Sequence, residues 1–261
     1  MRPAVATGAL LLALLLAGCS SGTDSATGGA DRTSAASSSP TSSAAGPSPT
    51  GTSGGAPATG AGKRKGCRSS GSGVPGGAAS APTLDVDGDG RADTEWIARD
   101  PASDGSITFG VTTASGGTFT GSIATASPVQ RSVLVADVTG KGTLIVLGSD
   151  GRQVLLFAIS NCQIVPVENI QGRQYAFDLG FTGYGTGVGC VDVDGNGTRD
   201  LAGLLANGTT VTRTAVELNG PRATNGPSST VADASQAQLD LAHQVTCGDL
   251  TLTGDGVSSN P

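Results

Sequence analysis

Residues 85–93 read Asp-Val-Asp-Gly-Asp-Gly-Arg-Ala-Asp, and residues 192–200 read Asp-Val-Asp-Gly-Asn-Gly-Thr-Arg-Asp. Both follow the pattern D-x-D-G-[DN]-G-x-x-D, with side-chain oxygens at its first, third, fifth and ninth positions. Ca²⁺ takes about six to eight oxygen ligands, which carboxylates and backbone carbonyls supply. Glycine adopts positive φ without strain, so each stretch can fold back around a cation. Each is a candidate calcium loop, although Asp, Asn and Gly also form turns that hold no metal.

The two candidate loops belong to a longer repeat. Residues 132–137 read S-V-L-V-A-D and lead into a loop in which Asp137 keeps the first position but Lys141 occupies the fifth. A lysine in place of a carboxylate argues against calcium there. A fourth, degenerate copy covers residues 243–256, with Asp249 at its first position. Such repetition at a nearly fixed period is typical of repeat architectures.

Short segments rich in apolar and β-branched residues surround each loop. The expected strands are residues 81–84, 94–99, 107–113, 118–124, 132–137, 143–147, 153–159, 163–167, 186–191, 200–205 and 210–218. Ser-Asp-Gly at 103–105 and 149–151, and Asn-Gly at 207–208, are hairpin signals between them. No window shows a helical period, so the sequence predicts an all-β domain. The long segment 219–240 is expected to run between strands and to offer a ligand surface.

This arrangement resembles the FG-GAP or VCBS repeat, the blade unit of integrin-α-like β-propellers. The resemblance rests on the two nonapeptides, each leading into a strand, and on residues 181–187, F-T-G-Y-G-T-G, which are similar to an F-G-x-G-x element. It implies a small or partial β-propeller of about three to four blades. The C-terminal half-repeat would pair with the strands after Asp85 and close the ring. An irregular compact β-domain is the alternative, because the family's closed rings have more blades.

The resemblance also implies which residues would hold Ca²⁺. In the family the ion lies in a loop between strands of a blade and has a largely structural role. The ligands carried over are Asp85, Asp87, Asp89, Asp93 and the Arg91 carbonyl in the first loop, and Asp192, Asp194, Asn196, Asp200 and the Thr198 carbonyl in the second. An EF-hand is excluded because its loop ends in a ligating glutamate, where these loops have Trp96 and Gly203.

The N-terminus has the pattern of an exported lipoprotein. Arg2 precedes an apolar run, residues 9–17, which is too short to span a bilayer and leads into Gly18-Cys19. This ending resembles the lipobox of bacterial lipoproteins, which implies a signal peptide at 1–18 and a lipid anchor on Cys19 that holds the chain on the outer side of the cell membrane. A secreted protein cleaved nearby is the alternative. Residues 19–80 are almost wholly Ser, Thr, Gly, Ala and Pro, so we expect a disordered linker before a repeat domain at 81–261.

Four cysteines remain if Cys19 carries lipid. An even number outside the cytoplasm favours two disulfides, and no pair has the C-x-x-C spacing of a zinc or redox site. Three pairings are open. We expect Cys67–Cys247, which would join the start of the ordered chain to its last strand, and Cys162–Cys190, which would join the middle repeat to the next strand.

Composition and motifs restrict the function. Residues 80–261 contain 9 Lys and Arg against 19 Asp and Glu, a net charge of −10, which argues against nucleic acid as a partner. His243 is the single histidine and no G-x-S-x-G motif is present, so an enzyme is not expected. Trp96, Tyr175 and Tyr184 are too few for an aromatic sugar platform and are expected in the core or at its edge.

We therefore expect a calcium-stabilised binding or scaffold module, held at the membrane through Cys19, whose partner is a surface protein or an envelope polysaccharide. A structural envelope lipoprotein without a specific ligand is one alternative. A hydrolase that uses loop carboxylates is another.

Overall fold

The computed structural model describes residues 66–69, 73–125 and 129–260, all within the unit 58–261. The expected signal peptide, Cys19 and most of the expected linker lie outside the described residues. The described chain is mainly antiparallel β-sheet with one short helix, which confirms the all-β class. That helix is too short to span a membrane.

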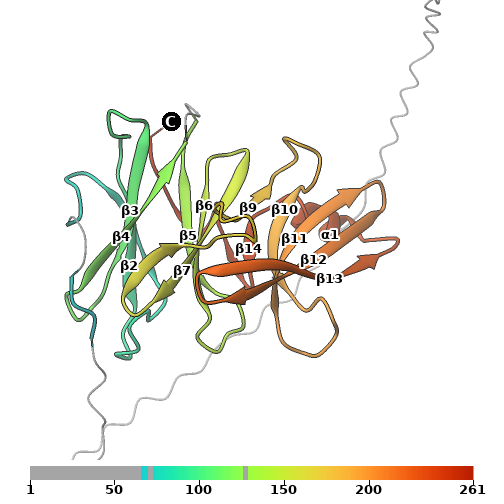
Figure 1. The fold of residues 1–261 in the computed structure, drawn as a ribbon, viewed down its shortest axis with the longest axis horizontal. Coiled ribbons are helices and arrows are strands. Elements are labelled where there is room, and N and C mark those ends of the chain that lie inside the picture. The colour runs from blue at the N-terminus through green and yellow to red at the C-terminus, as the bar shows by residue number, and fades with distance from the viewer. Residues whose placement is uncertain (1–65, 70–72, 126–128, 261) are drawn as a thin grey trace, which may run out of the picture. The chain divides into compact units, whose positions relative to one another are not determined.

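Three antiparallel sheets follow one another along the chain, and the middle one lies between the other two (Figure 1). The first sheet contains β1 (Ala79–Thr83), β2 (Asp93–Ile97), β3 (Ser106–Thr112) and β4 (Thr118–Ala124) in chain order. The middle sheet contains β5 (Ser132–Asp137), β6 (Leu144–Ser149), β7 (Gln153–Ser160) and β8 (Gln163–Pro166), extended by β9 (Ala176–Asp178) and β16 (Val257–Ser258). The third contains β10 (Gly187–Val191), β11 (Asp200–Asn207), β12 (Thr210–Asn219) and β13 (Arg222–Val231).

The expected strands are confirmed to within two residues at their ends. The expected hairpins are also present, because β2 pairs with β3, β6 with β7 and β11 with β12. Gly151 and Gly208 have φ of 81° and 60° in two of these turns, a left-handed conformation that glycine adopts without strain. Local turn chemistry and strand patterning therefore determine the meander within each sheet.

The middle sheet is buried on both faces. Side chains alternate between the faces of a strand, so Val133 and Val135 of β5 pack toward the first sheet, and Leu134 and Ala136 pack toward the third. Because both faces are covered, the strand reads as a continuous apolar run. A third, smaller core lies on the outer face of the third sheet, beside α1 (Gln236–Leu241).

The C-terminal segment does not close a ring, contrary to the expectation. A bridge joins Val245 to Val188 of β10, and β14 (Thr246–Cys247) pairs with β15 (Leu250–Thr251). The segment then ends in β16, which pairs with β5 of the middle sheet and not with the strands after Asp85. Its apolar side chains are used to fill the cores on both faces of the middle sheet, and no sheet of the described chain closes on itself.

All four cysteines outside the lipobox are paired, as expected, but the expected pairing is wrong. The disulfides are Cys67–Cys162 and Cys190–Cys247, with Cα atoms 5.5 and 4.4 Å apart. The stacking explains this, because the β7–β8 turn that carries Cys162 lies against the first sheet, beside the Cys67 segment, and β14 lies beside β10. Two disulfides indicate an environment outside the cytoplasm.

Segment 219–240 was expected to run between strands, but it contains secondary structure of its own. It contains β13, which pairs along most of β12, and the short helix α1. Ser235 caps the helix and forms a reciprocal capping box with Gln238, a signal that the sequence contains. β13 contains Gly and Pro and has weak strand propensity, so its pairing with β12 decides its conformation.

Candidate metal loops and candidate binding pocket

The loops that begin at Asp85, Asp137 and Asp192 occupy the same place, between β1 and β2, β5 and β6, and β10 and β11 of their respective sheets. In each, the first aspartate accepts a hydrogen bond from the backbone N–H five residues later. The donors are Gly90 for Asp85 at 2.7 Å, Gly142 for Asp137 at 2.7 Å and Gly197 for Asp192 at 2.9 Å. All three glycines have positive φ. Since the Asp137 loop shares this geometry, the first aspartate shapes the turn whether or not a metal binds.

Only two of these loops gather carboxylates. Among the described residues, Asp85, Asp87 and Asp89 bring carboxylate oxygens within 4.8 Å of one another, and so do Asp192, Asp194 and Asp200. Convergent carboxylates are the ligand type that Ca²⁺ prefers. The cluster of the second loop makes no ion pair with a described Lys or Arg. The donor sets of both loops therefore fit a hard divalent cation.

Two expected ligands, Asp93 and Asn196, are not among the gathered carboxylates. Both carboxylate oxygens of Asp93 are taken, by the N–H groups of Val86 at 2.7 Å and Ala114 at 2.8 Å, and the residue is buried. Burial raises the pKa of Asp93, although these hydrogen bonds oppose the shift. Asn196 turns its amide oxygen to the Thr198 N–H at 2.7 Å and its amide nitrogen to Asp194 at 2.9 Å.

Hydrogen bonds lower the pKa of two of the gathered carboxylates. Burial raises the pKa of the Asp87 carboxyl, but hydrogen bonds from the Ser115 hydroxyl at 2.6 Å and the Cys67 N–H at 3.2 Å lower it, and the net shift is downward. The N–H of Gly197 is the main cause of the lowered pKa of Asp192. Asp89 forms an exposed ion pair with Arg91 at 2.8 Å, and such surface pairs contribute little to stability.

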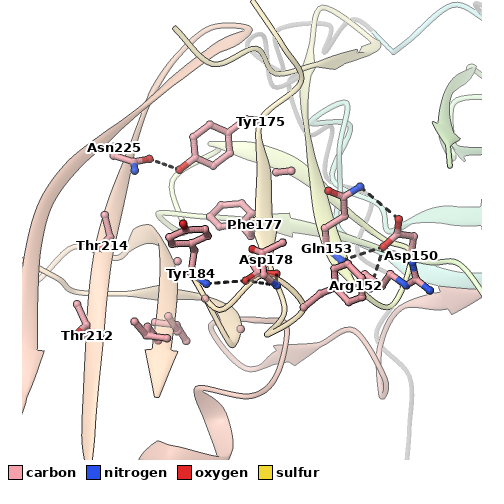
Figure 2. Close-up of a pocket in the computed structure, with 18 of the residues that line it drawn as sticks. Asp150, Arg152, Gln153, Tyr175, Phe177, Asp178, Tyr184, Thr212, Thr214 and Asn225 are labelled. Carbon is pink, nitrogen blue, oxygen red and sulfur yellow. Dashed lines mark hydrogen bonds between the residues drawn. The ribbon is translucent and has the colours of Figure 1, made fainter. Parts of the chain in front are cut away.

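A pocket of about 810 Å³ lies between the middle and third sheets (Figure 2). Its lining comes from the start of β7, from β9 and the loop after it, and from β11, β12 and β13. The lining includes Asp150, Arg152, Gln153, Tyr175, Phe177, Asp178, Phe181, Thr182, Tyr184, Thr212, Thr214 and Asn225.

The loop after β9 presents two aromatic rings to solvent. The Asp178 carboxylate holds the loop by accepting hydrogen bonds from the N–H groups of Thr182 at 3.0 Å and Tyr184 at 2.9 Å. Desolvation raises the pKa of Asp178, but these hydrogen bonds outweigh it and lower the pKa to about 2. The loop leaves Tyr184 88% exposed and Phe181 66% exposed, with the Arg152 guanidinium 4.7 Å from the Phe181 ring centre.

The opposite side of the pocket is partly buried and polar. The Tyr175 hydroxyl donates to the Asn225 side-chain oxygen, and burial raises the pKa of Tyr175 to about 12. Its ring packs edge-on against Phe177, with centres 5.1 Å apart. Figure 2 shows Thr212 and Thr214 on the same side as Asn225.

Sequence reasoning missed this pocket. Trp96 is buried as expected, at 1% exposure, but the expectation that Tyr184 belongs to the core or its edge is wrong. The missed signal is the run F-T-G-Y-G at 181–185, in which aromatic residues stand inside a glycine-rich turn. Gly185 has no room for a side chain, because a Cβ would lie 2.6 Å from the Asp178 carbonyl oxygen.

Comparison with known proteins yields no relative of this chain. No family model, no curated protein and no solved structure matches it. The resemblance to FG-GAP repeats therefore stays a prediction, and the functional inference rests on the loops and the pocket.

Proposed function

We propose that this protein is a non-enzymatic binding module on the outer side of the cell membrane, anchored by lipid on Cys19, whose ligand enters the pocket between the middle and third sheets. The observation that carries the proposal is the exposure of Phe181 and Tyr184 on a loop that Asp178 holds by backbone hydrogen bonds. Large apolar side chains gathered at a surface hollow mark interaction sites. The pocket volume of about 810 Å³ falls within the range of roughly 300–1,000 Å³ of small-molecule sites.

We further infer that the two carboxylate-rich loops bind Ca²⁺ and that the ion has a structural role. Asp85, Asp87 and Asp89 would hold one ion, and Asp192, Asp194 and Asp200 the other, together with the Arg91 and Thr198 carbonyls and the Asn196 side chain of the expected ligand set. A bound cation would remove the repulsion among each group of carboxylates. The net charge of residues 80–261 also argues against nucleic acid as the partner.

The three sheets are, in this proposal, repeat units of the FG-GAP or VCBS kind. Two features support it. Each unit begins with four antiparallel strands joined in chain order, and each carries its loop between the first and second of them.

The two disulfides agree with a place outside the cytoplasm, where the lipobox-like end of the apolar run would put the chain. The partner is a surface protein or an envelope polysaccharide.

A pull-down from detergent-solubilised envelope tests the binding function. The bait is the tagged full-length chain, either unchanged or with Phe181→Ala and Tyr184→Ala together. Ile170→Ala is the matched control, because Ile170 is also an exposed apolar side chain, at 74%, but does not line the pocket. We expect the unchanged chain and the control to recover the same molecule, and the double variant to lose it.

The variants must first be shown to unfold at the same temperature as the unchanged chain, which their exposed positions predict. If the unchanged chain recovers nothing beyond a tagged linker fragment, or if all three baits recover the same molecule equally, the pocket has no binding role. A structural envelope lipoprotein would then be the better description.

A further inference from the structure

We infer that the pocket binds an uncharged carbohydrate, with a sugar ring against Tyr184 and sugar hydroxyls against the side chains of β12 and β13; this inference rests on the binding function proposed above. The pocket combines two kinds of surface that such a ligand requires. One is an aromatic ring that is free to be covered, and the other is a group of neutral hydrogen-bonding side chains.

The Tyr184 ring supplies the apolar surface. At 88% exposure it has no side chain packed over it, whereas the Phe181 ring already has the Arg152 guanidinium on one face. A pyranose ring has an apolar C–H face and hydroxyls around its edge. A pyranose ring can therefore stack on the Tyr184 ring while its hydroxyls reach the polar groups beside that ring.

Neutral groups supply the polar surface. Within the described part of the chain, neither the Thr212 hydroxyl nor the Asn225 amide N–H groups has a hydrogen-bond partner, and Figure 2 shows both residues on one side of the pocket. Thr212 is half-buried and Asn225 is exposed, so both are open to water in the free protein, and a ligand that covers them without pairing them loses free energy. Sugar hydroxyls both donate and accept, which matches a hydroxyl and an amide equally well.

The charged lining groups give the pocket no net positive charge, which argues against an anionic ligand. Asp178 accepts from the N–H groups of Thr182 and Tyr184. Asp150 is buried and accepts from the N–H groups of Arg152 and Gln153, both at 3.0 Å. The Arg152 guanidinium lies on the Phe181 ring and makes no ion pair among the described residues. Two carboxylates and one guanidinium leave the lining with a net charge of −1, and both carboxylates already accept backbone hydrogen bonds, so the lining does not select a charged ligand.

A glycan array carrying both neutral and anionic oligosaccharides tests the inference, with the detergent-solubilised full-length chain as the probe. We expect binding to neutral glycans. Calorimetry with the free oligosaccharide that binds best should then show about a tenfold weaker affinity for Tyr184→Ala, because the ring contact is lost. Tyr184→Phe should retain most of the affinity, Thr212→Val should weaken it, and Ile170→Ala should leave it unchanged.

Three results would overturn the inference: no binding on the array, binding to anionic glycans alone, or binding that Tyr184→Ala leaves intact. The envelope pull-down separates this failure from failure of the proposed function. If the array is blank but the pull-down still recovers a protein that depends on Phe181 and Tyr184, the binding module stands and the carbohydrate is wrong. If that dependence is also missing, both are wrong.

Discussion

Glu95 is the most unusual single residue in the described chain, because it is a carboxyl group in the core between the first and middle sheets. It is 1% exposed. Its Oε2 accepts from the Val135 N–H of β5 at 2.7 Å and from the Thr83 hydroxyl at 3.4 Å, whereas Oε1 has no partner among the described residues. Burial raises the pKa of Glu95 to about 8, so the group is protonated at neutral pH.

This residue predicts a pH-dependent stability. A carboxyl whose pKa is raised on folding contributes fully below its ordinary value of 4.5, and the contribution is lost as the pH rises to about 8. Over that range the free energy of unfolding should fall by at most about 1.4 kcal/mol per pH unit. Glu95→Gln keeps the neutral shape and should remove this part of the slope. Urea unfolding at a series of pH values measures it, and identical slopes for the two proteins would contradict it.

At the scale of single residues, the sequence predicted the burial of a large apolar side chain but not the surroundings of polar or loop residues. Trp96 is buried as expected, since large apolar residues in a strand pattern belong to the core. Neither the burial of Glu95 nor the exposure of Tyr184 could be predicted. Glu95 lies on the opposite face of β2 from its neighbours Thr94 and Trp96, and a charged residue there is expected to face solvent. Only the packing of β5 against β2 buries it. Tyr184 depends on a loop conformation that Asp178 determines.

At the scale of the element, the turn geometry of the loops was predicted well because it is local. The aspartate-to-glycine hydrogen bond and the positive φ of the glycine both lie within one short stretch of chain. The strands were predicted for the same reason. β13 was missed, since its pairing partner and not its own sequence decides it, and α1 was missed because six residues are too few to show a helical period.

Calcium should raise the stability of the folded chain through the two carboxylate-rich loops. A cation that binds only the folded form stabilises by RT ln(1 + [L]/Kd), about 1.4 kcal/mol per site at roughly ten times Kd. Asp194→Ala is the cleanest test, because the hydrogen bonds of the Asp194 side chain to described residues all lie within its own loop. Thermal unfolding in EDTA and in millimolar calcium should show a smaller calcium-induced rise for this variant.

Two variants act as comparisons for that experiment. Asp87→Ala should also lower stability in EDTA, because Asp87 holds Ser115 and the Cys67 backbone in addition to its place in the first cluster. Lys141→Ala should leave the calcium response unchanged, since its loop gathers no carboxylates among the described residues. If the unfolding midpoint of the unchanged chain does not respond to calcium, the loops are turns that hold no metal.

At the scale of the whole molecule, the stacking of the sheets decides what the repeat pattern leaves open. The pattern identified the repeats, but not which edges of different repeats meet. The cysteine pairing and the course of the C-terminal segment both depend on that. The segment follows β10 and then reaches β5 because its apolar residues complete the cores on both faces of the middle sheet, which no local signal encodes.

The two disulfides should differ in what they contribute, and packing should decide the order. They join residues 95 and 57 positions apart, and the chain-entropy estimate differs between loops of these lengths by only about 0.5 kcal/mol, in favour of Cys67–Cys162. Cys190–Cys247 instead holds the C-terminal segment, whose Leu252 and Val257 are buried in two cores. Release of that segment exposes apolar surface worth about 1.5–3 kcal/mol per large side chain.

Replacing Cys190 and Cys247 together by alanine should therefore lower the unfolding midpoint more than replacing Cys67 and Cys162 together. Alanine is the right substitute, because serine would bury a hydroxyl at the three positions that are themselves buried. Peptide mapping without reduction must first find the links Cys67–Cys162 and Cys190–Cys247 in the unchanged chain. With that pairing established, an equal or reversed order of midpoints would mean that the C-terminal segment stays in place without its disulfide, and that the sheet stack alone fixes its course.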